Sequence, residues 1–209
     1  HVVKTLRGAL TTGRIGHAYL FCGPRGTGKT TLARLLAKSL NCKNRDKEGD
    51  CDNSCDICLS VNENRSLDLI EIDAASNRGI DEIRSLKESA LTAAPGGNHK
   101  VFIIDEVHML TKDAFNALLK ILEEPPSHVV FVLATTEPHK ILPTVLSRVQ
   151  RFDFKRFNPK QMLGKLKQMA KSEGVMINSD GLLAIAVSAD GALRDAEVAL
   201  SKVIASYDL

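Results

Sequence analysis

The sequence predicts an α/β protein: helices cover both faces of a five-stranded parallel sheet, and a small all-helical domain follows. Short apolar runs alternate with helical patterns as far as residue 157, and no strand pattern is found beyond it. A glycine-rich loop joins the first apolar run to a helix, as in phosphate-binding proteins. Because Asn158-Pro159 has the form of a helix start, we expect one domain at 1–157 and a second at 158–209.

Each expected element rests on the periodicity of its apolar residues. In the first domain we expect strands at 18–22, 67–72, 101–104, 129–134 and 149–154. The helices of this domain are expected at 2–10, 31–40, 80–91 and 112–122. The second domain should contain helices at 159–173, 179–189 and 191–206. The segment 42–58 is polar and rich in cysteine, and we interpret it as an insertion.

Composition excludes several classes of protein. Of the 209 residues, 44% are hydrophobic and 25% are charged, which is typical of a globular chain. The longest apolar runs, such as 129–134, have the length of a strand, so we expect neither a transmembrane helix nor a membrane partner. The net charge of +3 permits an anionic partner without requiring one. The chain opens on His1 with a helical pattern and no signal segment, and we interpret it as an excised piece of a longer cytoplasmic protein.

The glycine-rich loop carries a nucleotide-binding motif. Gly23-x4-Gly28-Lys29-Thr30 matches the P-loop pattern and lies between an expected strand and an expected helix. In such a loop, backbone N–H groups and the helix N-terminus bind the phosphates, Lys29 reaches the β- and γ-phosphates, and Thr30 is a ligand of Mg²⁺. A chance glycine-rich turn is the alternative. The expected nucleotide-binding residues are Gly23, Pro24, Arg25, Gly26, Thr27, Gly28, Lys29, Thr30 and Thr31.

Two carboxylates follow the third expected strand. Asp105 and Glu106 lie at its C-terminal end, which is the edge where open α/β sheets bind their ligands. We predict that Asp105 holds Mg²⁺, directly or through water, and that Glu106 orients and deprotonates the attacking water. An ordinary acidic turn is the alternative. We expect the nearby His108 to support the structure or the site rather than to react.

A polar residue at the end of the next strand completes the motif set. A whole strand–helix unit, 67–91, separates the P-loop unit from the Asp-Glu strand, which is the arrangement of additional-strand P-loop ATPases. In that arrangement a polar side chain on the following strand contacts the γ-phosphate or the attacking water. Thr136 is our first candidate and Thr135 our second, the alternative being a threonine that caps the loop.

Two arginines are further candidates. Arg148 closes a short helical turn, where a cation complements the helix dipole, so spacing alone favours a structural role. Arg194 lies in or near the first turn of a helix, where a cation is disfavoured, and a nearby phosphate would explain it. Pairing of Arg194 with Asp190 or Asp195 is the alternative.

The cysteines predict a metal site. Cys42-x8-Cys51-x3-Cys55-x2-Cys58 supplies four thiolates, enough for a closed, structural Zn²⁺ site, with redox-active or unligated thiols as the alternative. Cys22 lies within an expected buried strand and should act as a small hydrophobic residue.

These motifs together resemble the ATPase portion of the clamp-loader gamma/tau subunits of bacterial DNA polymerase III, in the AAA+ class. The resemblance extends over nearly the whole chain. It includes 17–21, the P-loop, the four cysteines, 68–76, 105–110, 115–120, 122–126, 133–138, 147–148 and 191–195.

The resemblance implies roles for the residues that spacing left open. It implies that Thr136 is sensor 1, that Arg194 is sensor 2, and that Arg148 is an arginine finger acting on a neighbouring subunit's ATP. It implies that the helical domain is a lid, and that the protein lies in the bacterial cytoplasm, associated with the nucleoid. It also implies that ATP drives loading of a sliding clamp onto primer–template DNA, in a ring with other clamp-loader subunits.

The sequence departs from the family in three respects. The second cysteine spacing is x3 where x2 is common, and Val149 follows the finger arginine where cysteine is frequent. The segment that helps to bind adenine and the collar domain are expected to lie outside this chain.

DNA contacts are predicted less specifically. The stretch 155–171 is basic. A face of the lid that is exposed to solvent would account for this positive charge as well as DNA binding would. Arg78, Arg84 and Lys140 are the candidates for the inner surface of the ring. Two other functions remain open: a branch-migration type of AAA+ DNA motor, and a structural or zinc-dependent DNA-binding module that retains a nucleotide.

Overall fold

The computed structural model describes residues 1–207 and divides into two compact units. The first unit contains 1–22 and 30–153, and the second contains 23–29 together with the chain from Phe154 onward. The glycine-rich loop is therefore grouped with the C-terminal helices, although the strand before it belongs to the first unit. Each unit is described by itself.

The first unit is built on a five-stranded parallel sheet, which confirms the predicted fold class. The strands are β1 (Ala18–Cys22), β2 (Leu69–Asp73), β3 (Lys100–Asp105), β4 (Val129–Thr135) and β5 (Gln150–Asp153), in the order β2-β3-β4-β1-β5. All neighbours run parallel. Every residue of β1 and β4 is buried, as expected for strands covered on both faces, so these segments read as continuous apolar runs.

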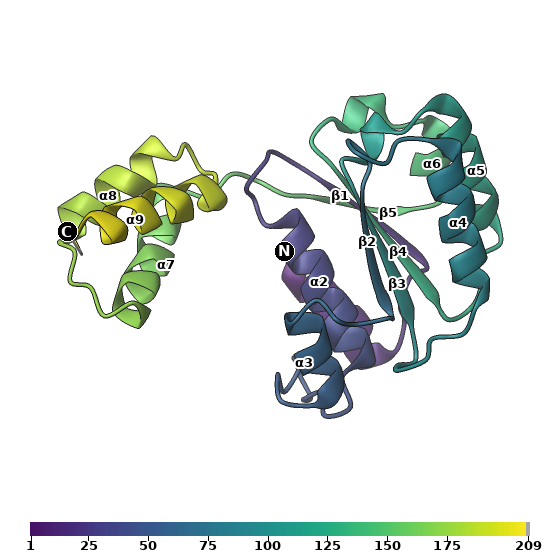
Figure 1. Cartoon of the computed structure of the whole chain (residues 1–209), viewed down its shortest axis with the longest axis horizontal. Helices are drawn as coiled ribbons and strands as arrows, with labels where there is room; N and C mark the ends of the chain where they lie inside the picture. The colour runs from purple at the N-terminus through teal and green to yellow at the C-terminus, as the bar shows by residue number, and fades with distance from the viewer. Residues whose placement is uncertain (208–209) are drawn as a thin grey trace. The chain divides into compact units, whose positions relative to one another are not determined.

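Helices cover both faces of this sheet (Figure 1), with α2 and α3 on one side and α4, α5 and α6 on the other. Their bounds are α1 (Val2–Thr12), α2 (Lys29–Asn41), α3 (Asp56–Asn62), α4 (Ile80–Leu91), α5 (Lys112–Glu123) and α6 (Pro143–Leu146). Two 3-10 turns, η1 (Val107–Met109) and η2 (Pro138–Lys140), follow β3 and β4. Helix α3 was not predicted, because its polar, cysteine-bearing sequence carries little apolar periodicity.

The core lies between the sheet and helices α4 and α5. Phe102 of β3 stacks on Phe131 of β4, with ring centroids 5.4 Å apart. Cys22 belongs to the same buried cluster and is 1% exposed, which agrees with its prediction as a small hydrophobic residue. Helix α5 is capped by Thr111, whose hydroxyl accepts a hydrogen bond from the N–H of Ala114. A close-packed centre of this kind holds the strand ends in fixed positions.

The second unit contains α7 (Pro159–Ser172), α8 (Ser179–Ser188) and α9 (Leu193–Tyr207). Asn158 and Gln161 form a capping box at the start of α7, where the Asn-Pro pair predicted a helix start. Met162, Leu166 and Leu200 lie in the apolar core between the helices. Within residues 1–207, no helix has the length and apolar character needed to cross a membrane.

Candidate functional site

The parallel strands end at one edge of the sheet, and this edge gathers the predicted carboxylates. Asp73 at the end of β2 is level with Asp105 at the end of β3, and Thr135 at the end of β4 is level with Cys22 at the end of β1. Because each motif residue follows one of these ends, residues far apart in the chain are brought close together. The register of the paired strands fixes the positions of these strand ends.

Thr30 and Asp105 are in direct contact at this edge. The Thr30 hydroxyl donates a hydrogen bond of 2.7 Å to Oδ2 of Asp105, across 75 residues of sequence. Both groups were predicted to bind Mg²⁺, and a hydroxyl beside a carboxylate is a donor set that suits this oxygen-seeking ion. The structure therefore brings the two predicted ligands into direct contact with each other.

Glu106 is held in an uncommon backbone conformation. Its φ of 46° and ψ of 44° lie in the left-handed region, which a residue with a side chain rarely occupies. Such residues concentrate at functional sites, where the surrounding structure maintains the strain. Oε2 of Glu106 accepts hydrogen bonds from the Thr136 hydroxyl (2.8 Å) and the Thr136 N–H (3.2 Å). The predicted base and the predicted sensor are therefore bonded to each other in this state.

His108 supports this pair from the interior. The side chain of His108 is only 5% exposed, and its Nδ1 lies 3.3 Å from Oε2 of Glu106 and 3.0 Å from the Thr135 hydroxyl. Thr135 is fully buried, and its hydroxyl also accepts a hydrogen bond of 3.0 Å from the N–H of Glu137. Of the two threonine candidates, only Thr136 is hydrogen-bonded to Glu106. Thr135 instead positions His108.

The P-loop is curled upon itself in the second unit. The ammonium group of Lys29 donates hydrogen bonds to the carbonyl oxygens of Gly23 (2.8 Å) and Pro24 (2.9 Å), and the Thr27 hydroxyl donates to the same Pro24 carbonyl (2.8 Å). A side chain at Gly23 would collide with the carbonyl oxygen of Phe154, and the backbone there has a φ of 151°. The glycine is therefore required by close backbone approach as well as by conformation.

Arg194 lies beside this loop. The N–H of Leu193, the first residue of α9, donates a hydrogen bond of 2.9 Å to the carbonyl oxygen of Gly26. Arg194 is thus in the first turn of α9, immediately after a residue bonded to the P-loop. Asp190, one of the carboxylates that could have neutralised it, pairs instead with Arg156 at 2.6 Å. The structure therefore keeps Arg194 next to the loop that was predicted to bind phosphate.

Arg148 is anchored within the first unit. Its guanidinium donates hydrogen bonds to Oε1 of Glu123 (2.8 Å) and to the carbonyl oxygen of Thr144 (2.7 Å). The side chain of Arg148 remains 33% exposed. Sequence reasoning did not find Glu123, because the partners are 25 residues apart and no local pattern joins them.

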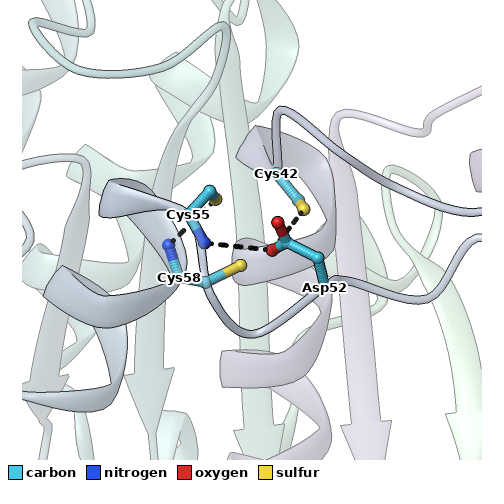
Figure 2. Close-up of side chains that lie close together, drawn as sticks. All are labelled: Cys42, Asp52, Cys55 and Cys58. Atoms are coloured by element: carbon cyan, nitrogen blue, oxygen red, sulfur yellow. Dashed lines mark hydrogen bonds between the residues drawn. The ribbon is translucent and has the colours of Figure 1, made fainter.

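The cysteine-rich segment forms a separate cluster of potential metal ligands (Figure 2), with Cys55 and Cys58 from the start of α3 and Cys42 just after α2. The cluster consists of Cys42, Asp52, Cys55 and Cys58, whose ligand atoms all lie within 4.8 Å of one another. Burial raises the pKa of the Cys58 thiol, whereas the Asn44 amide and nearby backbone N–H groups hold the pKa of Asp52 well below its usual range.

The cluster differs from the predicted set of four cysteines. Cys51 is not part of it; its sulfur lies 3.7 Å from the Ser39 hydroxyl and 3.9 Å from Oδ1 of Asn53. Asp52 was not considered a candidate from the sequence. The available signal was its spacing, since Asp52-x2-Cys55-x2-Cys58 is regular whereas the cysteine-only pattern is not.

Comparison with known proteins shows the family to which this chain belongs. The family described as "DNA polymerase III, delta subunit" matches residues 1–158. The DNA polymerase III subunit tau of Bacillus subtilis (strain 168) is 48% identical over 204 residues, which are 98% of this chain. The subunit tau of Escherichia coli (strain K12) is 46% identical over 208 residues, which are 100% of this chain. The chain belongs to the DNA polymerase III gamma/tau family. The resemblance inferred from the motifs is thereby confirmed.

The gamma/tau relatives are much longer than this chain. The matched residues cover 36% of the Bacillus subtilis protein and 32% of the Escherichia coli protein. This chain therefore spans about a third of the length of the curated relatives that it matches.

A solved structure confirms the fold at lower identity. The Thermotoga maritima RuvB Holliday junction branch migration motor has a TM-score of 0.71 and 22% identity, and the match covers 97% of this chain and 60% of that one. At this identity the likeness shows the fold alone, because one fold hosts many functions.

The three basic residues proposed for DNA binding are not equivalent in this gamma/tau chain. Arg84 pairs with Asp81 at 2.9 Å, and Lys140 pairs with Glu137 at 2.5 Å. The carbonyl of Arg78 accepts a hydrogen bond from the N–H of Thr111, which fixes its backbone.

Proposed function

We propose that this chain is the ATP-hydrolysing part of a clamp-loader subunit that places a sliding clamp on primed DNA. A pair of contacts carries the proposal: Thr30 contacts Asp105, and Thr136 contacts Glu106, at the carboxyl edge of one sheet. A sensor threonine in contact with a carboxylate base is an arrangement for controlling hydrolysis, not merely for retaining a nucleotide. The gamma/tau family supplies the biological setting.

In this proposal the P-loop binds the phosphates of ATP through its backbone N–H groups and Lys29. Lys29 exchanges its bonds to the Gly23 and Pro24 carbonyls for bonds to phosphate oxygens. Thr30 and Asp105 would hold Mg²⁺, and a bound Mg²⁺ would neutralise charge that develops on the phosphates. Arg194 contacts the γ-phosphate from the start of α9, so that the lid responds to the nucleotide.

Glu106 then acts as the general base. In the state described, its carboxylate is occupied by Thr136 and His108. Release of that contact allows Glu106 to orient the attacking water and accept its proton. Arg148 leaves Glu123 and stabilises the transition-state charge on the nucleotide of a neighbouring subunit. Hydrolysis thus depends on assembly with the neighbouring subunit. Within this chain we propose an ATPase domain, 1–157, and a lid domain, 158–209.

The partners proposed are the other clamp-loader subunits, the sliding clamp and primer–template DNA, in the bacterial cytoplasm. The branch-migration alternative rests on a fold likeness alone, and the non-hydrolysing alternative does not account for the contact between Glu106 and Thr136.

The test is ATP turnover by the complete protein, assembled with its partner subunits, with and without clamp and primed DNA. Glu106→Gln should lower stimulated turnover by about 10²–10⁴-fold and leave ATP binding intact. Glu173→Gln, an exposed residue at the end of α7, removes the same charge and should change neither. Turnover that is indifferent to the clamp would refute the loading function. Equal effects of the two variants would refute the role of Glu106.

A further inference from the structure

We propose that the fourth ligand of the zinc site is the carboxylate of Asp52 and that Cys51 lies outside the coordination sphere. The site would then hold Zn²⁺ through three thiolates, from Cys42, Cys55 and Cys58, and one carboxylate oxygen. This inference refines the zinc site predicted from the cysteines and is independent of the nucleotide chemistry.

The spacing of the four donor atoms fits a single tetrahedral ion. With Zn–S bonds of about 2.3 Å and Zn–O bonds of about 2.0–2.2 Å, ligand atoms of a tetrahedral site lie roughly 3.5–3.8 Å apart. The sulfur of Cys42 is 3.5 Å from Oδ1 of Asp52. All four donors lie within 4.8 Å, so an ion needs to draw them together by only about 1 Å.

The turn after Asp52 maintains this choice of ligand. Asn53 has a φ of 59°, a left-handed conformation that asparagine tolerates better than most residues. Oδ1 of Asn53 accepts a hydrogen bond of 2.6 Å from Lys38, which also donates to Oδ1 of Asn62 at 3.0 Å. Lys38 is only 6% exposed, so this turn is anchored to α2 and α3 by a buried cation.

The same turn holds the Cys51 side chain outside the cluster of Cys42, Asp52, Cys55 and Cys58. Its sulfur contacts Ser39 of α2 and the Asn53 side chain. Moving the Cys51 sulfur into the cluster would shift the chain by one residue. That shift would break the anchor of Asn53 to Lys38 and the hydrogen bonds of Asp52 with Asn44 and the Cys55 N–H. The carboxylate carries the same unit charge as a thiolate, so the substitution leaves the electrostatic balance around Zn²⁺ unchanged.

Alkylation of the zinc-loaded chain distinguishes the two ligand sets. A small alkylating reagent, followed by peptide mapping, should modify Cys51 rapidly and spare Cys42, Cys55 and Cys58, because ligation protects thiolates. Cys22 is buried and should react slowly. Protection of Cys51 to the same degree as Cys58 would overturn the proposal while leaving zinc in place. Stoichiometric zinc content near zero, with all four cysteines reacting, would overturn the metal site itself.

Variants provide a second, independent test by zinc competition with a chromophoric chelator. Cys58→Ser and Asp52→Asn should each weaken zinc binding by at least the ~10–100-fold that removal of a residue supporting a ligand costs. Cys51→Ser should leave the affinity unchanged. The proposal fails if Cys51→Ser weakens binding as much as Cys58→Ser does.

A gain-of-ligand variant separates coordination from loop stability. Asp52→Cys loses the carboxylate hydrogen bonds but supplies a fourth thiolate at the same position. With Co²⁺ as the probe, its thiolate charge-transfer absorption should rise by about a third over the wild type, as three thiolates become four. An unchanged absorption, or a wild type that already has the four-thiolate intensity, would overturn the assignment of Asp52.

Discussion

The nucleotide edge of the sheet and the cysteine loop were both predicted from short sequence motifs. The motif residues come together at the sheet edge, whereas in the loop one of them lies outside the cluster. At the sheet edge, Thr30 contacts Asp105 at the end of β3, and Thr136, which follows β4, contacts Glu106. In the loop, three predicted cysteines converge, and the fourth position is taken by a residue that the pattern did not suggest. A motif on a buried strand therefore fixes the side chain in space, whereas a motif in a loop fixes only the reach of the chain.

The physical cause is the number of constraints on each backbone. Residues of β3 and β4 are bonded to neighbouring strands and packed in the core, and a slip by one residue would turn every side chain to the opposite face and disrupt its packing. The loop 43–55 has no such ladder, so individual side-chain contacts decide which residues face inward. The expectation is that changes at the sheet edge alter chemistry, whereas changes in the cysteine loop alter stability.

The largest expected effect concerns the two arginines. Arg148→Ala should lower turnover in the assembled ring by ~10³-fold or more if it acts on a neighbour's nucleotide, and should leave ATP affinity of the single chain intact. Arg194→Ala should weaken ATP binding in the single chain, since Arg194 lies beside the P-loop. Both variants lose one positive charge, so general electrostatics cannot produce the contrast.

Equilibrium nucleotide binding on each single chain, followed by turnover in the assembly, measures this contrast. The in-trans role is wrong if Arg148→Ala weakens binding in the lone chain as much as Arg194→Ala does. The same role predicts slow hydrolysis by the isolated chain, and vigorous turnover by a dilute monomer would contradict it.

Removal of zinc should lower the stability of the fold and leave nucleotide binding unchanged, the reverse of what is expected for the arginine variants. We expect one Zn²⁺ per chain, and chelation should lower the free energy of unfolding by about 4 kcal/mol where zinc had exceeded its Kd a thousandfold. The Thr30–Asp105 contact belongs to the sheet edge, so ATP affinity of the protein that remains folded should be unchanged. Denaturant titrations with and without chelator, paired with nucleotide binding, measure both quantities. A parallel decrease in ATP affinity would show that the two regions are coupled.

The neighbouring threonines provide a smaller contrast within the sheet edge itself. Thr136→Val removes a hydrogen bond to the Glu106 carboxylate, worth about 1.5–3 kcal/mol, so turnover of the folded protein should change by roughly 10–100-fold. Thr135→Val removes the hydroxyl that contacts both the buried His108 ring and the N–H of Glu137, and should destabilise the fold by about 1–3 kcal/mol. Thermal unfolding and turnover of both variants decide between them, and a reversed pattern would assign the sensor to Thr135.

The smallest effect is expected for DNA. Neutralising Arg78, Arg84 and Lys140 in the full complex should reduce the slope of log K against log salt for primed DNA. The reduction should reach at most about 0.9 for each DNA phosphate that the variant no longer neutralises. The pairs with Asp81 and Glu137 already screen two of these charges, so the reduction should fall short of the full sum. An unchanged slope would exclude all three residues.

Several features followed from the sequence. The period of apolar residues predicted the strands and most helices, including α4 at 80–91 without error, because burial imposes that period. Element ends differed by one or two residues: β2 covers 69–73 where 67–72 was expected, and α9 begins at 193 instead of 191. These shifts reflect hydrogen bonds at the ends, which periodicity does not register.

The sequence by itself determined the sheet, the P-loop and the carboxylate edge, since each depends on local pattern or on strands that can pair in only one register. The tertiary structure alone decided which partners hold the reactive groups: Thr136 and His108 on Glu106, Glu123 on Arg148, and Asp52 among the cysteines. Each of these contacts joins residues in turns, loops or chain segments far apart in sequence. The meeting of Thr136 with Glu106 and of Glu123 with Arg148 depends on where the packed core directs the chain, and no short-range pattern encodes it.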